Sequence, residues 1–264
     1  MLILTYFLAI LIGLSLGLIG GGGSILTVPI LVYITGIDPV LATSYSLLIV
    51  GSASAIAAFQ KSRQQLIDYK KAIYFGLPSI ISVTLTRTFL LPSIPETIIE
   101  LKGFIISKDI FIMIFFSIIM LLASISMIIN KKELLNKSND INYTKIISLG
   151  FLVGLIAGFV GAGGGFLIVP ALVNFTGLEV KKAIGTSLLI IATNSLFGFI
   201  GDFMVGVDLD YKFVAIFIAI SVIGIYLGNL ISKSISGTNL KKGFGIFIIL
   251  MAVFIILKET NIIL

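Results

Sequence analysis

The stretch GLIGGGGSILTVP occupies residues 17–29, and the stretch GFVGAGGGFLIVP occupies residues 158–170. Both lie inside long apolar runs, and both close with the same Val-Pro pair. Glycine is less favourable than alanine in a helix interior by about 1 kcal/mol per residue, so consecutive glycines predict that a helix stops. The chain is therefore predicted to contain two apolar segments that are broken by glycines at the same relative place.

The similarity between the two stretches continues along the chain as an internal repeat. The alignment that pairs Pro29 with Pro170 needs one inserted residue before IDYK at 67–70 matches LDYK at 209–212. A polar stretch, KKELLNKSND, separates the two copies. The chain is interpreted as a duplication. The predicted parts are a first transmembrane repeat at 1–130, a cytoplasmic linker at 131–145 and a second transmembrane repeat at 146–264.

The composition indicates a membrane protein. Charged residues make up 11% of the 264 residues and hydrophobic residues 58%, with a mean hydropathy of +1.19, whereas a soluble domain carries about 25% charged residues. Several uncharged runs approach or exceed the ~20 residues that span a bilayer as a helix. We therefore expect a multi-pass protein of the cell membrane, surrounded by lipid. The predicted segments are the broken segments at 2–35 and 146–176 and helices at 39–60, 70–91, 109–130, 180–201, 212–232 and 241–257.

Residue types that are absent exclude several functions. The chain has neither Cys nor His, which excludes disulfides, thiolate or histidine metal sites, and intramembrane proteases that need a Ser/His pair. No catalytic residue, metal ligand or cofactor is predicted. The net charge of +6 comes from Lys and Arg in short loops, where topology signals are found, so no nucleic-acid partner is expected.

The distribution of Lys and Arg bears on the topology. If every segment crosses once with the N-terminus inside, 10 of these residues lie inside and 8 outside. If the glycine segments are hairpins that enter and leave on the same side, with the N-terminus outside, 13 lie inside and 5 outside. The second arrangement agrees better with the positive-inside rule. The predicted fold is an all-α polytopic membrane protein of two inverted four-segment repeats, each opening with a glycine-broken helix that is re-entrant or discontinuous.

The glycine clusters are predicted to bind a substrate. A helix break leaves bare amides, which are tolerated at membrane depth only where protein or a water-filled cavity surrounds them. Two such breaks in an inverted repeat are typical of secondary transporters, which hold substrates near the midplane. Ser24 is expected to cap the helix that follows, and open N–H groups at a helix start attract anions. Gly13, Gly17, Gly154 and Gly158, by contrast, have the spacing of helix-packing glycines.

Polar residues on the helices after each cluster complete the candidate site. Hydroxyl and amide side chains there can contact a substrate, although in membrane helices they often bond their own backbone. Arg87 is the only charged residue within an apolar span, and we expect it to extend to the surface near Pro92. The predicted substrate-binding residues are Gly20, Gly21, Gly22, Gly23, Ser24, Ser46, Gly161, Gly163, Gly164, Gly165, Thr186, Ser187 and Asn194.

The paired motifs GLIGGGGSILTVPIL and GFVGAGGGFLIVPAL, followed by ATSYSLLI and AIGTSLLI, resemble the sulfite exporter TauE/SafE family of membrane permeases over essentially the whole chain. The resemblance implies a secondary transporter of small anions such as sulfite, thiosulfate or sulfonates, with a proton as a candidate coupling ion. It also assigns binding to both glycine clusters, Ser46, Thr186 and Ser187. The first half departs from the family pattern at Tyr45, where the second half has Thr186, and this side chain is expected to narrow the site or to replace a hydroxyl contact.

Other functions remain as alternatives. A passive anion channel would fit the same residues, and carbonyls freed by Pro29 and Pro170 would suit a cation permease. The run GFIGD at 198–202 is close to an aspartyl protease motif, but its partner acid would lie in the same short loop, where a shared-proton dyad is hard to form. No carboxylate lies deep in a predicted span, so a coupling proton would use the substrate or loop-proximal acids. The sequence carries no signal for transport direction or oligomeric state.

Overall fold

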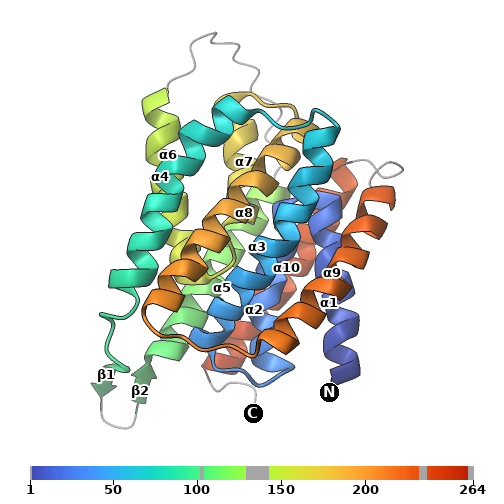
Figure 1. Ribbon diagram of the computed structural model, residues 1–264. Coiled ribbons are helices and arrows are strands. Elements are labelled where there is room, and N and C mark those ends of the chain that lie inside the picture. Colours follow the sequence, from blue (N-terminus) through green and yellow to red (C-terminus); the bar gives the residue numbers. More distant parts are fainter. Residues whose placement is uncertain (1, 102–103, 129–142, 232–236, 261–264) are drawn as a thin grey trace.

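The computed structural model describes residues 2–101, 104–128, 143–231 and 237–260, and nearly all of these are helical (Figure 1). Most of the predicted linker at 131–145 lies outside the described residues. The first half contains α1 (Leu2–Ile19), η1 (Gly21–Gly23), α2 (Ser24–Tyr33), α3 (Pro39–Arg63), α4 (Tyr69–Leu85), the π-helical turn η2 (Thr86–Leu90) and α5 (Lys108–Ile128). The second half contains α6 (Tyr143–Val160), α7 (Gly165–Thr176), α8 (Val180–Met204), α9 (Tyr211–Ile231) and α10 (Gly237–Glu259).

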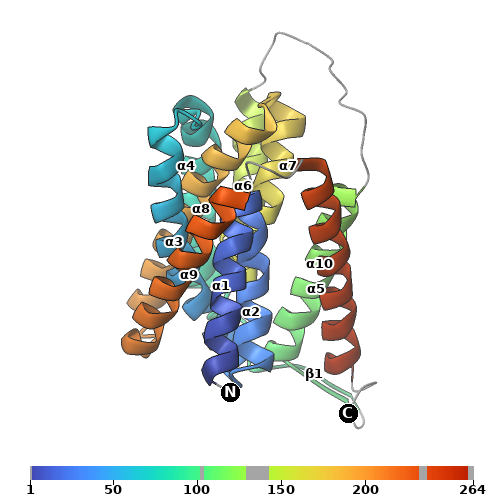
Figure 2. The same cartoon turned by 90° about the vertical axis from the view of Figure 1, so that its right-hand side faces the viewer.

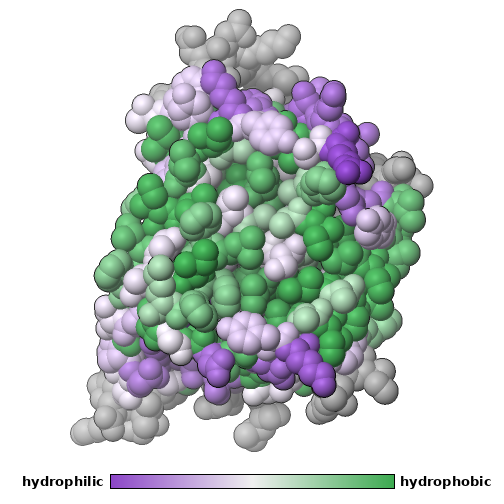
Figure 3. All heavy atoms as spheres, in the orientation of Figure 1, coloured by the Kyte–Doolittle hydropathy of each residue, from purple (hydrophilic) through white to green (hydrophobic). Residues whose placement is uncertain are grey.

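The outer surface of the bundle carries an apolar belt between two polar ends (Figure 3). Large apolar side chains such as Phe59, Phe89 and Leu230 are more than 60% exposed, an arrangement that lipid tolerates and water does not. Six helices of the described chain are long and apolar enough to cross a membrane. The prediction of a helical, multi-pass membrane protein is confirmed.

Each broken segment forms a helical hairpin. A β-carbon added to Gly23 would lie 2.5 Å from the carbonyl oxygen of Ile12, although a continuous helix would separate these residues by about 16 Å at 1.5 Å per residue. The chain therefore turns at residues 20–23, and α2 returns toward the end at which α1 began (Figure 2). In the second half, a β-carbon on Gly164 would lie 2.9 Å from that of Ala157, so α7 likewise folds back on α6.

Two pairs of parallel helices connect the halves through glycines. Along α1 and α9, Gly13 packs on the carbonyl of Ser221, and Gly17 packs on that of Ile225. Along α4 and α6, Gly154 packs on the carbonyl of Ser79. In each place an added β-carbon would overlap the neighbouring backbone. The prediction that these glycines allow close helix packing is confirmed.

The helices α3 and α8 form the centre of the bundle. In the most apolar part of α3, 67% of the residues are buried, and in that of α8 61% are buried. The corresponding share in α9 is 33%. Gly51 of α3 lies against Leu196 and Ser195 of α8, so these two helices pack closely. The helices α5 and α10 lie side by side at one edge of the bundle (Figure 2). Polar side chains on α3 and α8 are therefore held in the protein interior rather than in lipid.

Replacing Gly154 by alanine is expected to destabilise the protein, whereas the same change at Gly76 is not. Alanine favours a helix by about 1 kcal/mol over glycine at both places. At Gly154 the methyl group would overlap the carbonyl of Ser79, and overpacking of this kind costs about 1–3 kcal/mol. At Gly76 the nearest atom is 3.7 Å away. Thermal unfolding in detergent should give a lower midpoint for Gly154→Ala only; equal midpoints would contradict the close contact.

One element of the fold was not predicted. Residues 97–107 contain a small antiparallel hairpin of β1 (Thr97–Leu101) and β2 (Phe104–Ser107), at the end of the bundle where α5 begins (Figure 1). Pro92 and Pro95 precede it, and proline cannot continue a helix. The isoleucine-rich sequence that follows has the β-branched residues that favour strands.

Candidate functional site

The two glycine breaks meet in the interior of the bundle. A β-carbon added to Gly21 would overlap the carbonyl group of Gly165, and one added to Gly165 would lie against the backbone of Gly21. Such backbone contact requires glycine on both sides. Glycines of both clusters are buried where their burial is described: Gly20, Gly21, Gly23, Gly161, Gly163, Gly164 and Gly165, with Gly22 inside η1. The structure thus brings together the two predicted glycine sets from opposite halves of the chain.

At the first break the expected cap is absent. The residue that precedes α2 is Gly23, and it makes no side-chain capping bond. Ser24 is the first residue of α2, and its hydroxyl donates to the carbonyl of Gly21 at 2.8 Å. The prediction that Ser24 caps this helix is therefore wrong. Because Ser24 already belongs to α2, its hydroxyl does not cap the helix and instead holds the turn of η1 through its bond to Gly21.

At the second break the backbone is left-handed. Gly161, Gly163 and Gly164 have φ values of 68°, 62° and 71°, a region that side-chain-bearing residues rarely adopt. Gly164 directly precedes α7. Within the described residues, the N–H groups of Ala162, Gly163 and Gly164 donate no backbone hydrogen bond. The start of α7 therefore presents buried donors, together with the positive end of the helix dipole.

Hydroxyl groups of α8 lie against both breaks. A β-carbon on Gly20 would lie 3.2 Å from the hydroxyl of Ser187, which itself donates to the carbonyl of Ile184 at 2.8 Å. Gly163 lies against the hydroxyl of Ser195. The hydroxyls of Ser46 and Ser195 are fully buried and have no partner within the described chain. Of the polar residues that were predicted, Ser187 therefore lies at a break, and Ser46 offers an unused hydroxyl.

Ser54 was not predicted, although the sequence contained a signal for it. Its hydroxyl is fully buried and unpartnered in the described structure, like that of Ser195. The repeat alignment that pairs Pro29 with Pro170 also pairs Ser54 with Ser195. A hydroxyl at the same place in both halves was thus visible from the alignment alone.

Thr186 and its counterpart Tyr45 hold the starts of other helices. The hydroxyl of Thr186 accepts a bond from the N–H of Asp68 at 2.9 Å, and the hydroxyl of Tyr45 accepts one from the N–H of Asp210 at 2.8 Å. Asp68 caps α4, where its carboxylate accepts from the N–H of Lys71. Tyr45 thus makes in one half the contact that Thr186 makes in the other. Both hydroxyls are used for structure.

Replacing Thr186 by valine should lower stability without changing substrate affinity. Valine has nearly the same shape but cannot accept the bond from Asp68, and loss of one buried hydrogen bond costs about 1 kcal/mol. The thermal midpoint should fall by a few degrees, while the KM for the transported anion stays within a factor of two. A KM that rises several-fold with an unchanged midpoint would instead identify Thr186 as a substrate ligand.

Asn194 faces α4. Its amide nitrogen donates to the hydroxyl of Ser79 at 2.7 Å, and the side chain is fully buried. Its amide oxygen has no partner within the described residues. The bond joins α8 to α4, so Asn194 has a role in helix packing. If Asn194 also binds substrate, as predicted, it must do so while this bond is in place.

Arg87 is buried, and the prediction that it extends to the surface is wrong. Its side chain is 0% exposed, and Nη1 lies 3.3 Å from Oδ2 of Asp202, whose side chain is 4% exposed. The same nitrogen donates to the hydroxyl of Thr43 at 2.9 Å. Asp202 belongs to the last turn of α8, which ends at Met204. The two charges face each other between the adjacent elements η2 and α8, and this pairing makes their burial possible.

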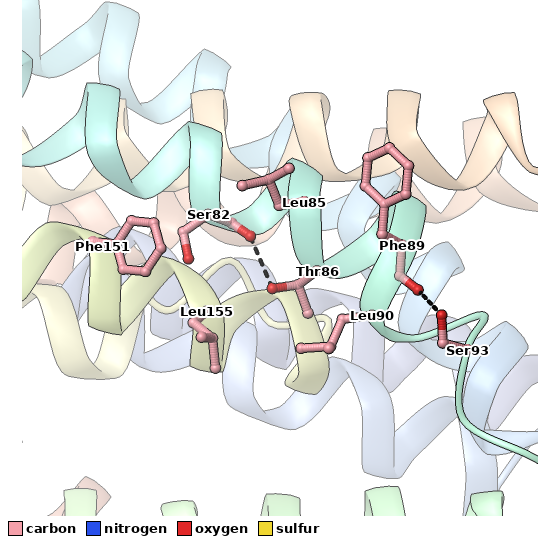
Figure 4. Close-up of a pocket in the computed structure, with 8 residues that line it drawn as sticks. All are labelled: Ser82, Leu85, Thr86, Phe89, Leu90, Ser93, Phe151 and Leu155. Carbon is pink, nitrogen blue, oxygen red and sulfur yellow. Dashed lines mark hydrogen bonds between the residues drawn. The ribbon is translucent and has the colours of Figure 1, made fainter.

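A separate cavity of about 290 Å³ lies between η2 and α6. Its lining is mainly apolar, and Figure 4 shows two of its hydroxyls bonded to backbone: that of Thr86 donates to the carbonyl of Ser82, and that of Ser93 donates to the carbonyl of Phe89. The hydroxyl of Ser82 itself has no partner within the described residues. Leu85 and Phe89 on its rim are 46% and 65% exposed. These features suit contact with lipid rather than binding of a polar substrate.

Comparison with known proteins identifies the family. The family described as Sulfite exporter TauE/SafE matches residues 5–255. The chain belongs to this family. A relative from Xylella fastidiosa (strain 9a5c) is 29% identical over 260 residues, which cover 94% of this chain and 92% of the relative. One from Haemophilus influenzae is 25% identical and covers 97% and 98%. Both are named "Probable membrane transporter protein". No solved structure matches the chain.

Membership of the TauE/SafE family confirms three expectations. The chain is a multi-pass membrane protein, it is of the permease type, and it is a transporter rather than an enzyme. The resemblance that the glycine motifs carried is thereby confirmed over nearly the whole chain.

Proposed function

We propose that this TauE/SafE protein is a secondary transporter that moves a small anion, a sulfur-containing oxyanion or an organosulfonate, across the cell membrane. The anion binds near the midplane, between the two glycine breaks. A proton is the proposed coupling ion. The backbone contact between Gly21 and Gly165 carries this proposal, since it joins two helix breaks from opposite halves in a buried place.

The chemistry at the breaks suits an anion. The N–H groups of Ala162–Gly164 donate no backbone bond in the described structure, and amides at a helix start bind anions without a basic side chain. The unpartnered hydroxyl of Ser195, against Gly163, adds a buried donor there, and Ser46 carries a second unpartnered hydroxyl on α3. A sulfur oxyanion presents several acceptor oxygens, which these donors can share.

We infer further that the halves are inverted repeats that open with re-entrant hairpins. The helix α1 begins at the end of the bundle where α9 begins, and α6 begins at the opposite end (Figure 1). The end of α7 lies beside the start of α4, since Lys71 donates to the carbonyl of Thr176. The end of α2 lies beside the end of α10, since Tyr33 donates to Glu259. Inverted repeats supply two equivalent states that open to opposite sides, as alternating access requires.

Uptake into liposomes tests the proposal. The purified protein is reconstituted, and labelled sulfite, thiosulfate or methanesulfonate is supplied with and without a pH gradient, with protein-free liposomes as the blank. We expect saturable accumulation of one anion above its outside concentration when the gradient is present. Flux that equilibrates the anion but never concentrates it would indicate a passive channel. If none of these anions moves, the anion proposal fails and cations become the substrates to test.

A further inference from the structure

The guanidinium of Arg87 reaches the second glycine break. A β-carbon added to Gly161 would lie 2.7 Å from Nη2 of Arg87 and would overlap Thr43. The guanidinium can lie against the break only because residue 161 is a glycine. Arg87 sits in the π-helical turn η2, where the N–H of Leu91 donates to the carbonyl of Thr86 at 2.8 Å. Single π-turns are rare and often occur at functional sites.

The guanidinium is incompletely paired. Only Nη1 has partners, and its distances to the two oxygens of Asp202 are 3.3 and 3.5 Å, whereas a strong charge-assisted bond measures about 2.7–2.9 Å. No atom of the described residues accepts a bond from Nε or Nη2. A fully buried charge with two unpaired donor nitrogens lowers the stability of the protein. An anion that accepts bonds from these nitrogens would offset that loss.

We propose that Arg87 is a substrate-binding residue that holds the transported anion at the second glycine break, and that Asp202, which lies at Nη1, is the resident counter-ion with which the anion competes for the guanidinium charge. This inference rests on the proposed transport of an anion. Nε and Nη2 form an edge of the guanidinium suited to two oxygens of one oxyanion. The amides of Ala162–Gly164 lie in the same break and face the same ligand.

The first break lacks this charge. The register that pairs Tyr69 with Tyr211 also pairs Arg87 with Asn229. Asn229 donates to the side-chain oxygen of Gln60 at 2.6 Å, so a neutral pair stands where the other half has an ion pair. Gly20 meets Ile184 and Ser187 there. Because only the second break has an arginine beside it, we place the charged group of the substrate at the second break. The uncharged part of the substrate then lies at the first break.

The test compares variants in the liposome assay. The double variant Arg87→Gln/Asp202→Asn removes both charges while keeping hydrogen-bonding side chains, so it avoids the isolated charge that destabilises single variants. Arg87→Lys keeps the charge but loses the flat, forked shape. Asp202→Asn removes only the competing carboxylate. Thermal midpoints in detergent accompany every KM, and the wild type in the same preparation tests the proposed transport itself.

We expect the double variant to fold with a midpoint near that of the wild type and to lose uptake about 100-fold, as loss of charged hydrogen bonds implies. Arg87→Lys should raise KM about 10-fold, and Asp202→Asn should lower it. A folded double variant with wild-type KM would overturn the assignment of Arg87. If the double variant does not fold, an unchanged KM in Arg87→Lys overturns it equally. A KM that Asp202→Asn leaves unchanged or raises overturns the competition between Asp202 and the anion. A wild type that moves no anion would show that the transport proposal had failed first.

Discussion

Replacing Gly163 and Gly164 together by leucine should reduce anion uptake to the level of empty liposomes, a loss of more than about 100-fold. Both glycines have left-handed backbones, which cost an ordinary residue about 1–2 kcal/mol each. A β-carbon at Gly163 would also overlap the hydroxyl of Ser195, and one at Gly164 would lie 2.9 Å from the side chain of Ala157. The backbone must move, and the open amides of the break move with it.

A matched control separates this effect from backbone strain. Gly36 and Gly177 also have left-handed φ values, 73° and 63°, but nothing lies within 4 Å of a β-carbon added to either. The variant Gly36→Leu/Gly177→Leu therefore shares the strain and leaves the breaks intact. Uptake should survive in this control. If both double variants lose uptake to the same degree, or if Gly163→Leu/Gly164→Leu transports like the wild type, the glycine breaks are not the binding site.

Single cysteines should be labelled from opposite sides of the membrane in an all-or-none manner. The chain has no native cysteine, so each introduced thiol reports alone. Gln64 and Glu179 are exposed in the loops that join α3 to α4 and α7 to α8, which lie at one end of the bundle (Figure 1). Ser93 and Asp208 are exposed in the segments that follow η2 and α8, at the other end. In intact cells, an impermeant maleimide should label Ser93→Cys and Asp208→Cys. Gln64→Cys and Glu179→Cys should react only after the membrane is opened.

The pair Gln64 and Glu179 decides the topology. If the segment at 146–176 is a hairpin, both residues lie on the same side. If it crosses once, they lie on opposite sides, and Glu179→Cys would be labelled in intact cells. That result would make the halves parallel repeats and would remove the basis for two equivalent transport states that open to opposite sides.

The sequence predicted those features that depend on local signals. Runs of glycine interrupt helices wherever they occur, so the boundaries near residues 20 and 161 could be placed without a partner. Packing glycines such as Gly13 and Gly154 follow a spacing that one helix reveals alone. The contact between Gly21 and Gly165 was a different matter. The expectation that the breaks lie together rested on the proposed inverted repeat and on the midplane position of such breaks in transporters.

The burial of Arg87 could not be predicted in the same way. Its partner Asp202 is 115 residues away, and the helices that carry them are apolar on nearly every face, so periodicity does not tell which face is buried. An arginine near a helix end is compatible with surface and interior alike. The roles of Thr186 and Tyr45 were hidden for a similar reason, because each hydroxyl is used by a loop of the other half.

The parallel pairing of α1 with α9 has a consequence for biosynthesis. Gly13 packs on Ser221, and roughly 200 residues must be synthesised between the two. At ~5–20 residues per second, α1 waits about 10–40 s in the bilayer before the surface that completes it emerges. The first half made alone would keep the glycine groove of α1 unfilled, and the carbonyls of α4 that receive the glycines of α6 would have no partner. The two halves are thus a single folding unit, and a ribosome that stops between them leaves a product suited to recognition by membrane quality control.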